Sequence, residues 1–267
     1  MTAQQGFAPF VTTIGNGSRR ALALHCTMAF GGAWAGFAKA LPALTLVAPD
    51  MPSHGQSPDW DETSSFGETV FQASLAAMDD MPMDLIGHSF GAMIALRIAV
   101  DAPERVRSLT VIEPVFFAVA KADAPDTLTE HAVKARPFTD AMEAGDRETA
   151  ARRFNRMWSD DGPRWDSLPE RTRAAMTRAV HVVPDTQDFL FEDTEGLLNA
   201  GALDACTVPT LVVRGSAAHP AITAANNGLT ERMPNATSVV IDGAGHMAPI
   251  THPLELAKVM GPLLARS

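Results

Sequence analysis

The sequence predicts an α/β fold, a mostly parallel sheet with helices on both faces and a helical cap inserted after the strand that ends at Glu113. Three observations predict it. Short apolar runs alternate with helix-forming stretches up to residue 114 and again from residue 205. Between residues 115 and 204 the strand pattern is replaced by helical patterns. A Gly-x-Ser-x-Gly pentapeptide joins a strand pattern to a helix pattern inside the first of these parts.

The predicted elements follow one another along the chain. An edge strand or hairpin arm is expected at Phe7 to Ile14. Runs typical of buried parallel strands lie at residues 21–25, 44–48, 83–86, 108–112, 210–214 and 238–241, and helical patterns end near residue 41 and cover 63–81, 92–100 and 253–265. We therefore expect a core domain made of residues 1–114 and 205–267, and a cap made of residues 115–204. Two helical stretches of the cap are expected at 139–158 and 170–183.

The pentapeptide Gly87-His88-Ser89-Phe90-Gly91 is the strongest local pattern. A serine on a sharp turn between a strand and a helix must adopt strained backbone angles, and a side chain at either flanking position would meet neighbouring backbone. Glycine at both positions removes that obstacle. The first N–H groups of the following helix are then free to stabilise an oxyanion. The pattern predicts that Ser89 is a nucleophile.

Composition limits the classes of function. The chain has 267 residues, of which 46% are hydrophobic and 19% charged, as in globular proteins. Its formal net charge of −10 argues against nucleic acids and anionic membranes as partners. No uninterrupted apolar run is long enough for a membrane span, and Met1 to Phe10 lacks a basic segment followed by an apolar one. We expect a cytoplasmic protein with a small-molecule substrate, and the oligomeric state stays open.

Cofactor and redox chemistry have no sequence support. Cys26 and Cys206 show no metal-binding spacing and are expected to be reduced, buried thiols. The Asp and His residues show no ligand spacing, and no dinucleotide glycine fingerprint follows a strand. Tyrosine is absent, so no phenol takes part in the chemistry. We expect neither a metal nor an organic cofactor.

Taken together and in this order, five segments resemble the α/β-hydrolase superfamily. They are the loop after His25, Asp50-Met51-Pro52-Ser53-His54-Gly55-Gln56-Ser57, the pentapeptide around Ser89, the strand 210–215, and Gly243-Ala244-Gly245-His246. The resemblance extends over nearly the whole chain. It implies the fold far more strongly than it implies a substrate.

His246 is the expected general base. It lies in a glycine-rich loop after the last strand, where the superfamily has its catalytic histidine. A serine hydroxyl needs such an imidazole to take its proton at neutral pH. His25 and His54 occupy loops in which histidines of this fold usually have structural roles, and His88 is expected to point to the other side of the turn.

The acidic residue departs from the common pattern. Most members carry an aspartate three residues beyond the glycine of the penultimate strand, but this chain has Ala218 there. A minority take the acid from the end of the strand after the nucleophile, which here is Glu113. Because an unpaired buried carboxylate is costly, pairing with His246 explains an acid at the end of an apolar strand. A Ser–His dyad, or an acid from the cap such as Asp188 or Glu192, stays open.

Two backbone N–H groups are expected to form the oxyanion hole. One belongs to Phe90, directly after the nucleophile. The other, by resemblance, belongs to the loop after the first buried parallel strand, where Thr27 is the first choice and Met28 the second. Aromatic and methionine side chains near the site line either a substrate pocket or the interface between cap and core: Phe30, Trp34, Phe116, Phe117, Met157 and Trp158.

The resemblance and the residues together predict a serine hydrolase that cleaves carboxylic esters of small or medium, mostly apolar acyl groups. A serine at this position argues against dehalogenase and epoxide-hydrolase chemistry, which needs an aspartate. The alternatives that use the same residues are a carbon–carbon bond (diketone) hydrolase, a cofactor-free perhydrolase and an acyltransferase. A ligand-binding pseudoenzyme on the same fold is the alternative from another class, and Ala218 is the feature that favours it.

Overall fold

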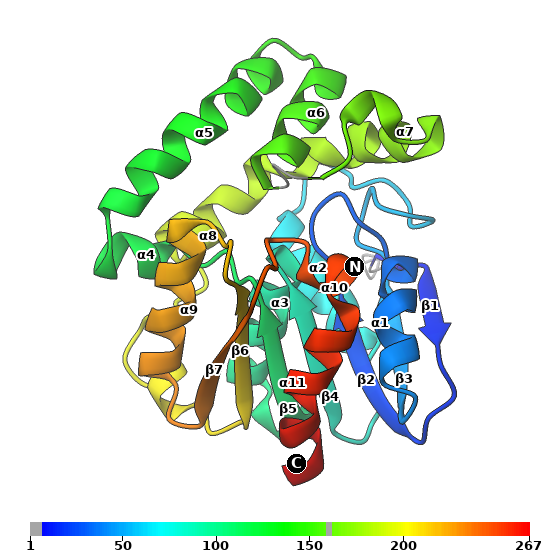
Figure 1. Ribbon diagram of the computed structural model, residues 1–267, viewed down its shortest axis with the longest axis vertical. Helices are drawn as coiled ribbons and strands as arrows, with labels where there is room; N and C mark the ends of the chain where they lie inside the picture. The colour runs from blue at the N-terminus through cyan, green and yellow to red at the C-terminus, as the bar shows by residue number, and fades with distance from the viewer. Residues whose placement is uncertain (1–6, 159–161) are drawn as a thin grey trace, which may run out of the picture.

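The structure, a computed structural model, describes residues 7–158 and 162–267. Within these residues, seven strands form one sheet in the order β1-β3-β2-β4-β5-β6-β7 (Figure 1). Strand β1 is antiparallel to β3, and all other neighbours are parallel. The strands are β1 (Val11–Ile14), β2 (Arg19–Leu24), β3 (Leu44–Pro49), β4 (Met83–His88), β5 (Val106–Ile112), β6 (Thr210–Gly215) and β7 (Ala236–Ile241). The predicted α/β sheet, including an edge strand at its start, is confirmed.

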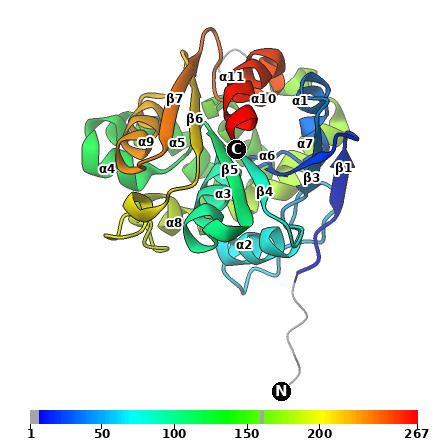
Figure 2. The ribbon, with the colours of Figure 1, turned by 90° about the horizontal axis from the view of Figure 1, so that it is seen from below.

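Helices cover both faces of the sheet (Figure 2). One face packs against α2 (Phe66–Ala76), α3 (Phe90–Asp101) and α9 (Pro220–Arg232). The other packs against α1 (Ala35–Ala40) and α11 (Pro253–Arg266), with the short α10 (Ala248–Thr251) beside them. The central strands β2, β3 and β4 contain mostly buried residues because they are covered on both sides. Helix α2 is shorter than the helix predicted at 63–81, and no helix was predicted where α9 lies.

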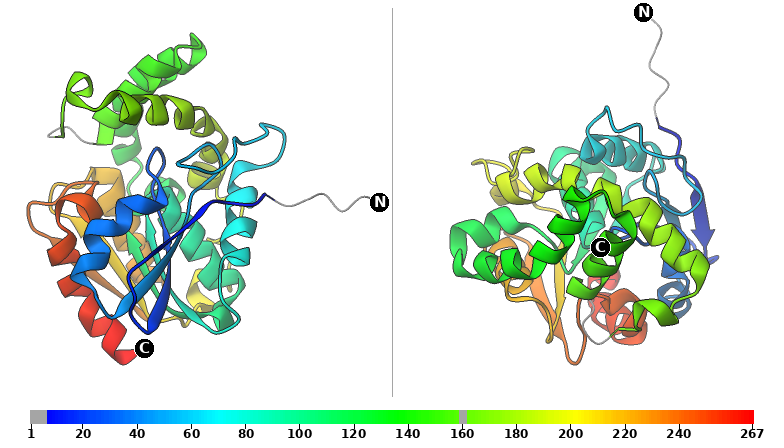
Figure 3. Two further views of the ribbon diagram at one scale, coloured as in Figure 1. Left: turned by 90° about the vertical axis from the view of Figure 1, so that its right-hand side faces the viewer. Right: turned by 90° about the horizontal axis from the view of Figure 1, so that it is seen from above.

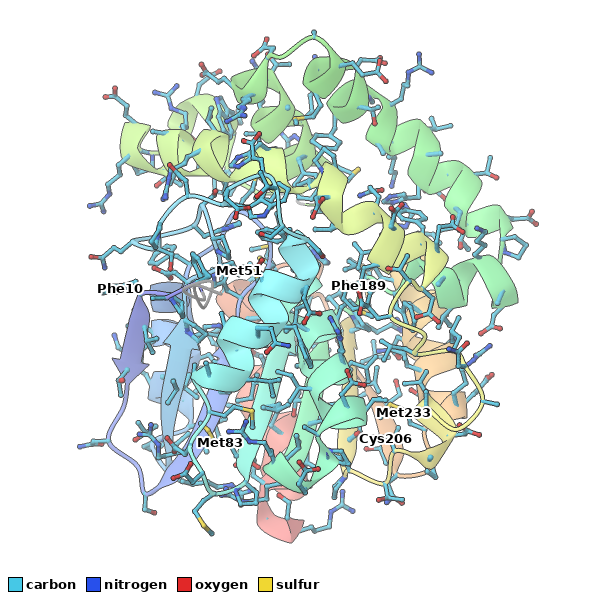
Figure 4. All side chains as sticks on the ribbon, turned by 180° about the vertical axis from the view of Figure 1, so that it is seen from behind. Phe10, Met51, Met83, Phe189, Cys206 and Met233 are labelled. Carbon is cyan, nitrogen blue, oxygen red and sulfur yellow. The ribbon has the colours of Figure 1, made fainter. Side chains whose placement is uncertain are left out.

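The larger apolar core lies between the sheet and α2, α3 and α9. Met51, Met83, Phe189, Cys206 and Met233 all belong to it, although they come from distant parts of the chain (Figure 4). Phe189 is contributed by the helical segment between β5 and β6, so this segment is anchored in the core of the sheet.

Between β5 and β6 the described residues form helices and turns without a strand. The helices are α4 (Phe117–Asp123), α5 (Asp126–Glu143), α6 (Arg147–Trp158), α7 (Glu170–Ala179) and α8 (Gln187–Glu192). Helices α5, α6 and α7 lie beyond the carboxyl ends of the parallel strands (Figures 1 and 3). The helical stretch predicted at 139–158 is two helices, because Gly145 (φ 73°) makes a turn between α5 and α6.

None of the helices within the described residues has both the length and the apolar character needed to span a membrane.

Candidate active site

Ser89 lies on a tight turn between β4, which ends at His88, and α3, which begins at Phe90. Its backbone angles are φ 56° and ψ −119°, a conformation that costs a non-glycine residue on the order of 1–3 kcal/mol. A Cβ at Gly87 would lie 2.4 Å from the Gly91 oxygen, and one at Gly91 would lie 2.4 Å from the Leu24 oxygen. Glycine is therefore needed at both positions, because a side chain would clash with neighbouring backbone, as predicted from the sequence.

A chain of side chains links Ser89 to His246 and Glu113. The Nε2 atom of His246 is 3.0 Å from Ser89 Oγ, and its Nδ1 atom is 3.2 Å from Glu113 Oε2. All three side chains are buried. The structure thus brings together the three residues that the sequence singled out. His246 lies between Ser89, whose proton it can accept, and Glu113, which orients its ring.

Glu113 is fully buried and has two polar partners. Its Oε1 atom accepts a hydrogen bond from the Gly215 backbone N–H at 2.6 Å, and Oε2 faces His246. Its backbone has a positive φ of 51° at the end of β5. Both carboxylate oxygens thus have the partners that an acid inside the protein requires.

The carboxylates from the helical segment lie elsewhere. Asp188 is exposed, and Glu192 forms an exposed ion pair with Lys121 at 2.7 Å. Among the described residues, neither forms a hydrogen bond or ion pair with His246, whereas Glu113 does. Asp204 accepts a hydrogen bond from the Gly201 N–H.

The N–H groups of Thr27 and Phe90 are available beside Ser89. Neither donates to an acceptor among the described residues, and Thr27, Phe90 and Ser89 line one cavity. The Met28 N–H, by contrast, donates to His54 Nε2 at 2.9 Å. Of the two residues considered in this loop, Thr27 is the one with an N–H group left for a ligand.

His25 and His54 hold the two loops beside the site together. His25 Nε2 accepts from the Met51 N–H at 3.1 Å, while His54 Nε2 accepts from the Met28 N–H. Burial lowers the pKa of His25, and burial together with the charge of His25 lowers the pKa of His54 to about 3. Both rings are neutral at pH 7, as acceptor nitrogens require. The structural roles predicted for them are confirmed.

His88 has a partner that the sequence did not reveal. Its Nε2–H donates to the backbone oxygen of His246 at 2.7 Å, and its ring centroid lies 5.1 Å from that of His246. Burial lowers its pKa well below the usual value, so the ring is neutral and Nε2 carries the proton. His88 therefore holds the loop that carries His246.

Cys26, next to Thr27, behaves as a packing residue. It is buried, and burial raises the pKa of its thiol to about 12. Thiolate is the reactive form, so Cys26 is no second nucleophile at neutral pH. Cys206 is a free buried thiol as well.

Two cavities meet at Ser89. The outer cavity, of about 750 Å³, is lined by residues that include Phe30, Met176, Arg171 and Asn155. The inner cavity, of about 490 Å³, is lined by residues that include Phe117, Phe138, Met157 and His131. Both volumes are within the usual range for small-molecule sites. Thr27, Ser89, Phe154 and Trp158 line both cavities.

Trp158 lines both cavities and lies beside the ring of His246. Its ring centroid lies 4.6 Å from that of His246, with the planes inclined by 32°. Phe30, Phe117, Met157 and Trp158 line a cavity, which is one of the two roles considered for them from the sequence. Trp34 and Phe116 belong instead to the buried core. The sequence did not single out Phe154 or His131, because α5 and α6 carry no motif.

Within residues 7–158 and 162–267, no group of three or more His, Cys, Asp or Glu side chains is arranged to hold a metal ion.

Comparisons with known proteins agree with this fold. Residues 22–253 match the model of the alpha/beta hydrolase fold family. The chain is 30% identical over 268 residues to a pimeloyl-[acyl-carrier protein] methyl ester esterase of Methylococcus capsulatus, covering 97% of this chain and 99% of that protein. It is 27% identical to the lipase LipV of Mycobacterium tuberculosis, over 92% and 93% of the two chains. A solved hydrolase of Pseudomonas aeruginosa superposes with a TM-score of 0.73 at 18% identity, covering 99% of this chain and 97% of that one.

Proposed function

The chain belongs to the alpha/beta hydrolase family, and from this premise we propose that it is a serine hydrolase that cleaves carboxylic esters through an acyl-enzyme. One observation carries the proposal. The imidazole of His246 lies between Ser89 Oγ at 3.0 Å and Glu113 Oε2 at 3.2 Å, with two free N–H groups nearby. An activated serine beside an oxyanion site is the arrangement that acyl transfer needs.

In the first half of the reaction, Ser89 Oγ attacks the ester carbonyl and its proton passes to His246 Nε2. The N–H groups of Thr27 and Phe90 donate to the oxygen of the tetrahedral intermediate, and each is worth on the order of 10²–10³ in rate. Glu113 accepts from His246 Nδ1 and stabilises the imidazolium. The carbon–oxygen bond to the alcohol then breaks, and His246 gives the proton to the departing oxygen.

In the second half, water takes the place of the alcohol. His246 removes a proton from the water as it attacks the acyl-enzyme, and the same N–H groups hold the new oxyanion. Collapse of this intermediate returns the proton to Ser89 Oγ and releases the carboxylic acid.

The cavities and the relatives support a proposal for the substrate class. Both linings are mostly apolar, and Arg171 and Asn155 belong to the outer one. We propose that the acyl group enters the inner cavity and that the alcohol leaves through the outer cavity, past Arg171 and Asn155. Residues 115–204 then act as a cap that closes the site from above the sheet. A methyl ester is the first kind of substrate to test, because the relative from Methylococcus capsulatus is named as a methyl ester esterase.

A series of p-nitrophenyl and methyl esters of increasing acyl length tests the proposal with wild type, Ser89→Ala and Glu113→Gln. We expect hydrolysis of short or medium chains by wild type and none by Ser89→Ala. A fluorophosphonate should label wild type and leave Ser89→Ala unlabelled. Labelling without hydrolysis of any ester would favour a carbon–carbon bond hydrolase or perhydrolase, and absence of both would favour the pseudoenzyme.

A further inference from the structure

The inner cavity contains one buried histidine that the proposed reaction does not use. His131 lies on α5, is 6% exposed, and lines this cavity together with Ser89. Most of the neighbouring lining is apolar, with Val115, Phe117, Phe138, Met157 and Leu190 among its members. A histidine in such a lining is unusual, because a leucine or phenylalanine would pack there without a polar atom.

The ring of His131 contains a nitrogen that has no hydrogen-bond partner among the described residues. This atom, Nδ1, is buried. Nearly all buried polar atoms in proteins have a partner, so a buried histidine without one calls for an explanation. Nδ1 is shielded from solvent, whereas Nε2, which also has no hydrogen-bond partner among the described residues, is not. A ligand in the cavity that hydrogen-bonds to Nε2 supplies the explanation.

The ring of His131 is held firmly in place by aromatic side chains. Its centroid lies 4.6 Å from that of Phe117, 5.6 Å from Trp158 and 5.8 Å from Phe191. Trp158 in turn contacts the ring of His246. A polar group fixed in a rigid aromatic frame within the same cavity as the nucleophile gives directional recognition of a substrate at little entropic cost.

The charge state of His131 limits the ligand chemistry. Burial, with smaller contributions from the charges of His219 and Lys134, lowers the pKa of His131 to about 4. The ring is neutral at pH 7 and offers one N–H donor and one acceptor nitrogen. A neutral ring suits an uncharged oxygen function, a ketone, hydroxyl or ether, better than an anion.

We propose that His131 is a specificity-determining residue that hydrogen-bonds an uncharged oxygen on the acyl chain, so that the enzyme prefers oxygenated acyl groups to plain alkyl chains of equal length. This inference rests on the proposed ester hydrolysis and on the assignment of the acyl group to the inner cavity.

The test compares p-nitrophenyl hexanoate with analogues in which each chain methylene in turn is replaced by a ketone. For one analogue we expect wild type to show a kcat/KM roughly tenfold above that for hexanoate, the size of one buried neutral hydrogen bond. His131→Phe, which keeps the aromatic contacts, should abolish the preference, so that the ratio of kcat/KM for this analogue to that for hexanoate falls by about tenfold. The control His252→Phe, outside both cavities, should keep the preference.

A second pair of variants covers the case in which His131→Phe does not fold. His131→Asn and His131→Leu have side chains of similar size, and only asparagine can hydrogen-bond. We expect Asn to retain part of the preference and Leu to lose it. No preference in wild type for any ketone position, or an equal preference in wild type and the Leu variant, would overturn the proposal.

Binding separates this inference from the proposed function. The affinities of Ser89→Ala for the methyl esters of hexanoic acid and its keto analogues are measured by calorimetry, with and without His131→Phe. If no ester is hydrolysed and Ser89 is not labelled, the proposed function fails. A ketone preference in binding that depends on His131 then still supports the inference, and its absence overturns it.

Discussion

The Glu113 Oε1 atom accepts a hydrogen bond from the Gly215 backbone N–H at 2.6 Å, so the end of β6 holds the acidic side chain that leaves β5. This contact fixes one carboxylate oxygen and turns the other toward His246. In the pattern that the superfamily resemblance implies, the acid follows the strand that ends at Gly215. Here the end of that strand, β6, instead donates a backbone N–H to Glu113, which follows the neighbouring strand β5.

Replacing Glu113 by Gln should separate catalysis from folding. The amide oxygen can still accept from the Gly215 N–H, but the amide has no charge with which to stabilise a His246 imidazolium. We expect kcat/KM for the best ester to fall by about 10³–10⁴, by analogy with removal of the acid from other triads. In urea unfolding experiments, the free energy of unfolding should change much less in Glu113→Gln than in Glu113→Ala. Wild-type activity in Glu113→Gln would rule out Glu113 as the acid and favour a dyad.

Gly91→Ala should destabilise the protein because there is no room for a methyl group. A Cβ there would lie 2.4 Å from the Leu24 oxygen and 2.5 Å from the His25 oxygen, both in the backbone. We expect a loss of about 1–3 kcal/mol in the free energy of unfolding, measured in urea. Gly36→Ala is the control, since nothing lies within 4 Å of its Cβ and a gain of about 0.5–1 kcal/mol is expected in a helix. Equal effects in both variants would contradict the prediction.

Much of the fold was predictable because strands and helices that pack on a sheet carry their own periodicity. The strand before Ser89 and the helix after it were predicted within a few residues of β4 and α3. The helical segment was predicted less well. Helix α5 begins at Asp126 and contains Pro137, and the turn at Gly145 lies inside a stretch that reads as continuous helix. Local propensity does not determine such boundaries when packing does.

Part of the candidate site was likewise predictable from the sequence, and part was not. Ser89 was found by the Gly-x-Ser-x-Gly pattern, His246 by the resemblance of its glycine-rich loop, and Glu113 because a carboxylate is unusual at the end of an apolar strand. The contacts of His88 and His131 were not predicted, because nothing in the local sequence indicates them. Their roles depend on what lies opposite: the backbone oxygen of His246 for one, and the wall of the inner cavity for the other.

Stability should fall as the pH drops below about 6.5, partly because of His54. Its pKa is about 3 in the folded protein and about 6.5 when unfolded, so between these values the unfolded chain binds more protons. The stabilisation is complete above pH 6.5 and is lost toward pH 3, at up to about 1.4 kcal/mol per pH unit. When the free energy of unfolding in urea is plotted against pH, His54→Gln should give a shallower slope than wild type. Parallel curves would contradict this.

Replacing His88 should impair turnover more than binding. In His88→Leu the His246 carbonyl loses its donor, so the loop is held less firmly and the imidazole is less well aimed at Ser89. We expect kcat to fall on the order of tenfold, with KM nearly unchanged. His88→Gln keeps an N–H donor and should recover part of the loss. A Gln variant no better than Leu, or a fall confined to KM, would show that the hydrogen bond does not act in this way.

Trp158→Ala should change the chain-length preference of the enzyme. The indole lines both cavities and lies against the His246 ring, so its removal joins the inner and outer cavities at the nucleophile. We expect the ratio of kcat/KM for long esters to that for short esters to rise by about tenfold, since one or two extra methylenes in an apolar pocket are worth that much. The absolute rate on short esters should fall, because the imidazole loses an aromatic neighbour that restricts it. Trp158→Phe, which keeps a ring there, should resemble wild type. A chain-length profile that is identical in Trp158→Ala and wild type would mean that the indole does not limit the acyl site and that the limit lies deeper, at residues such as Phe138.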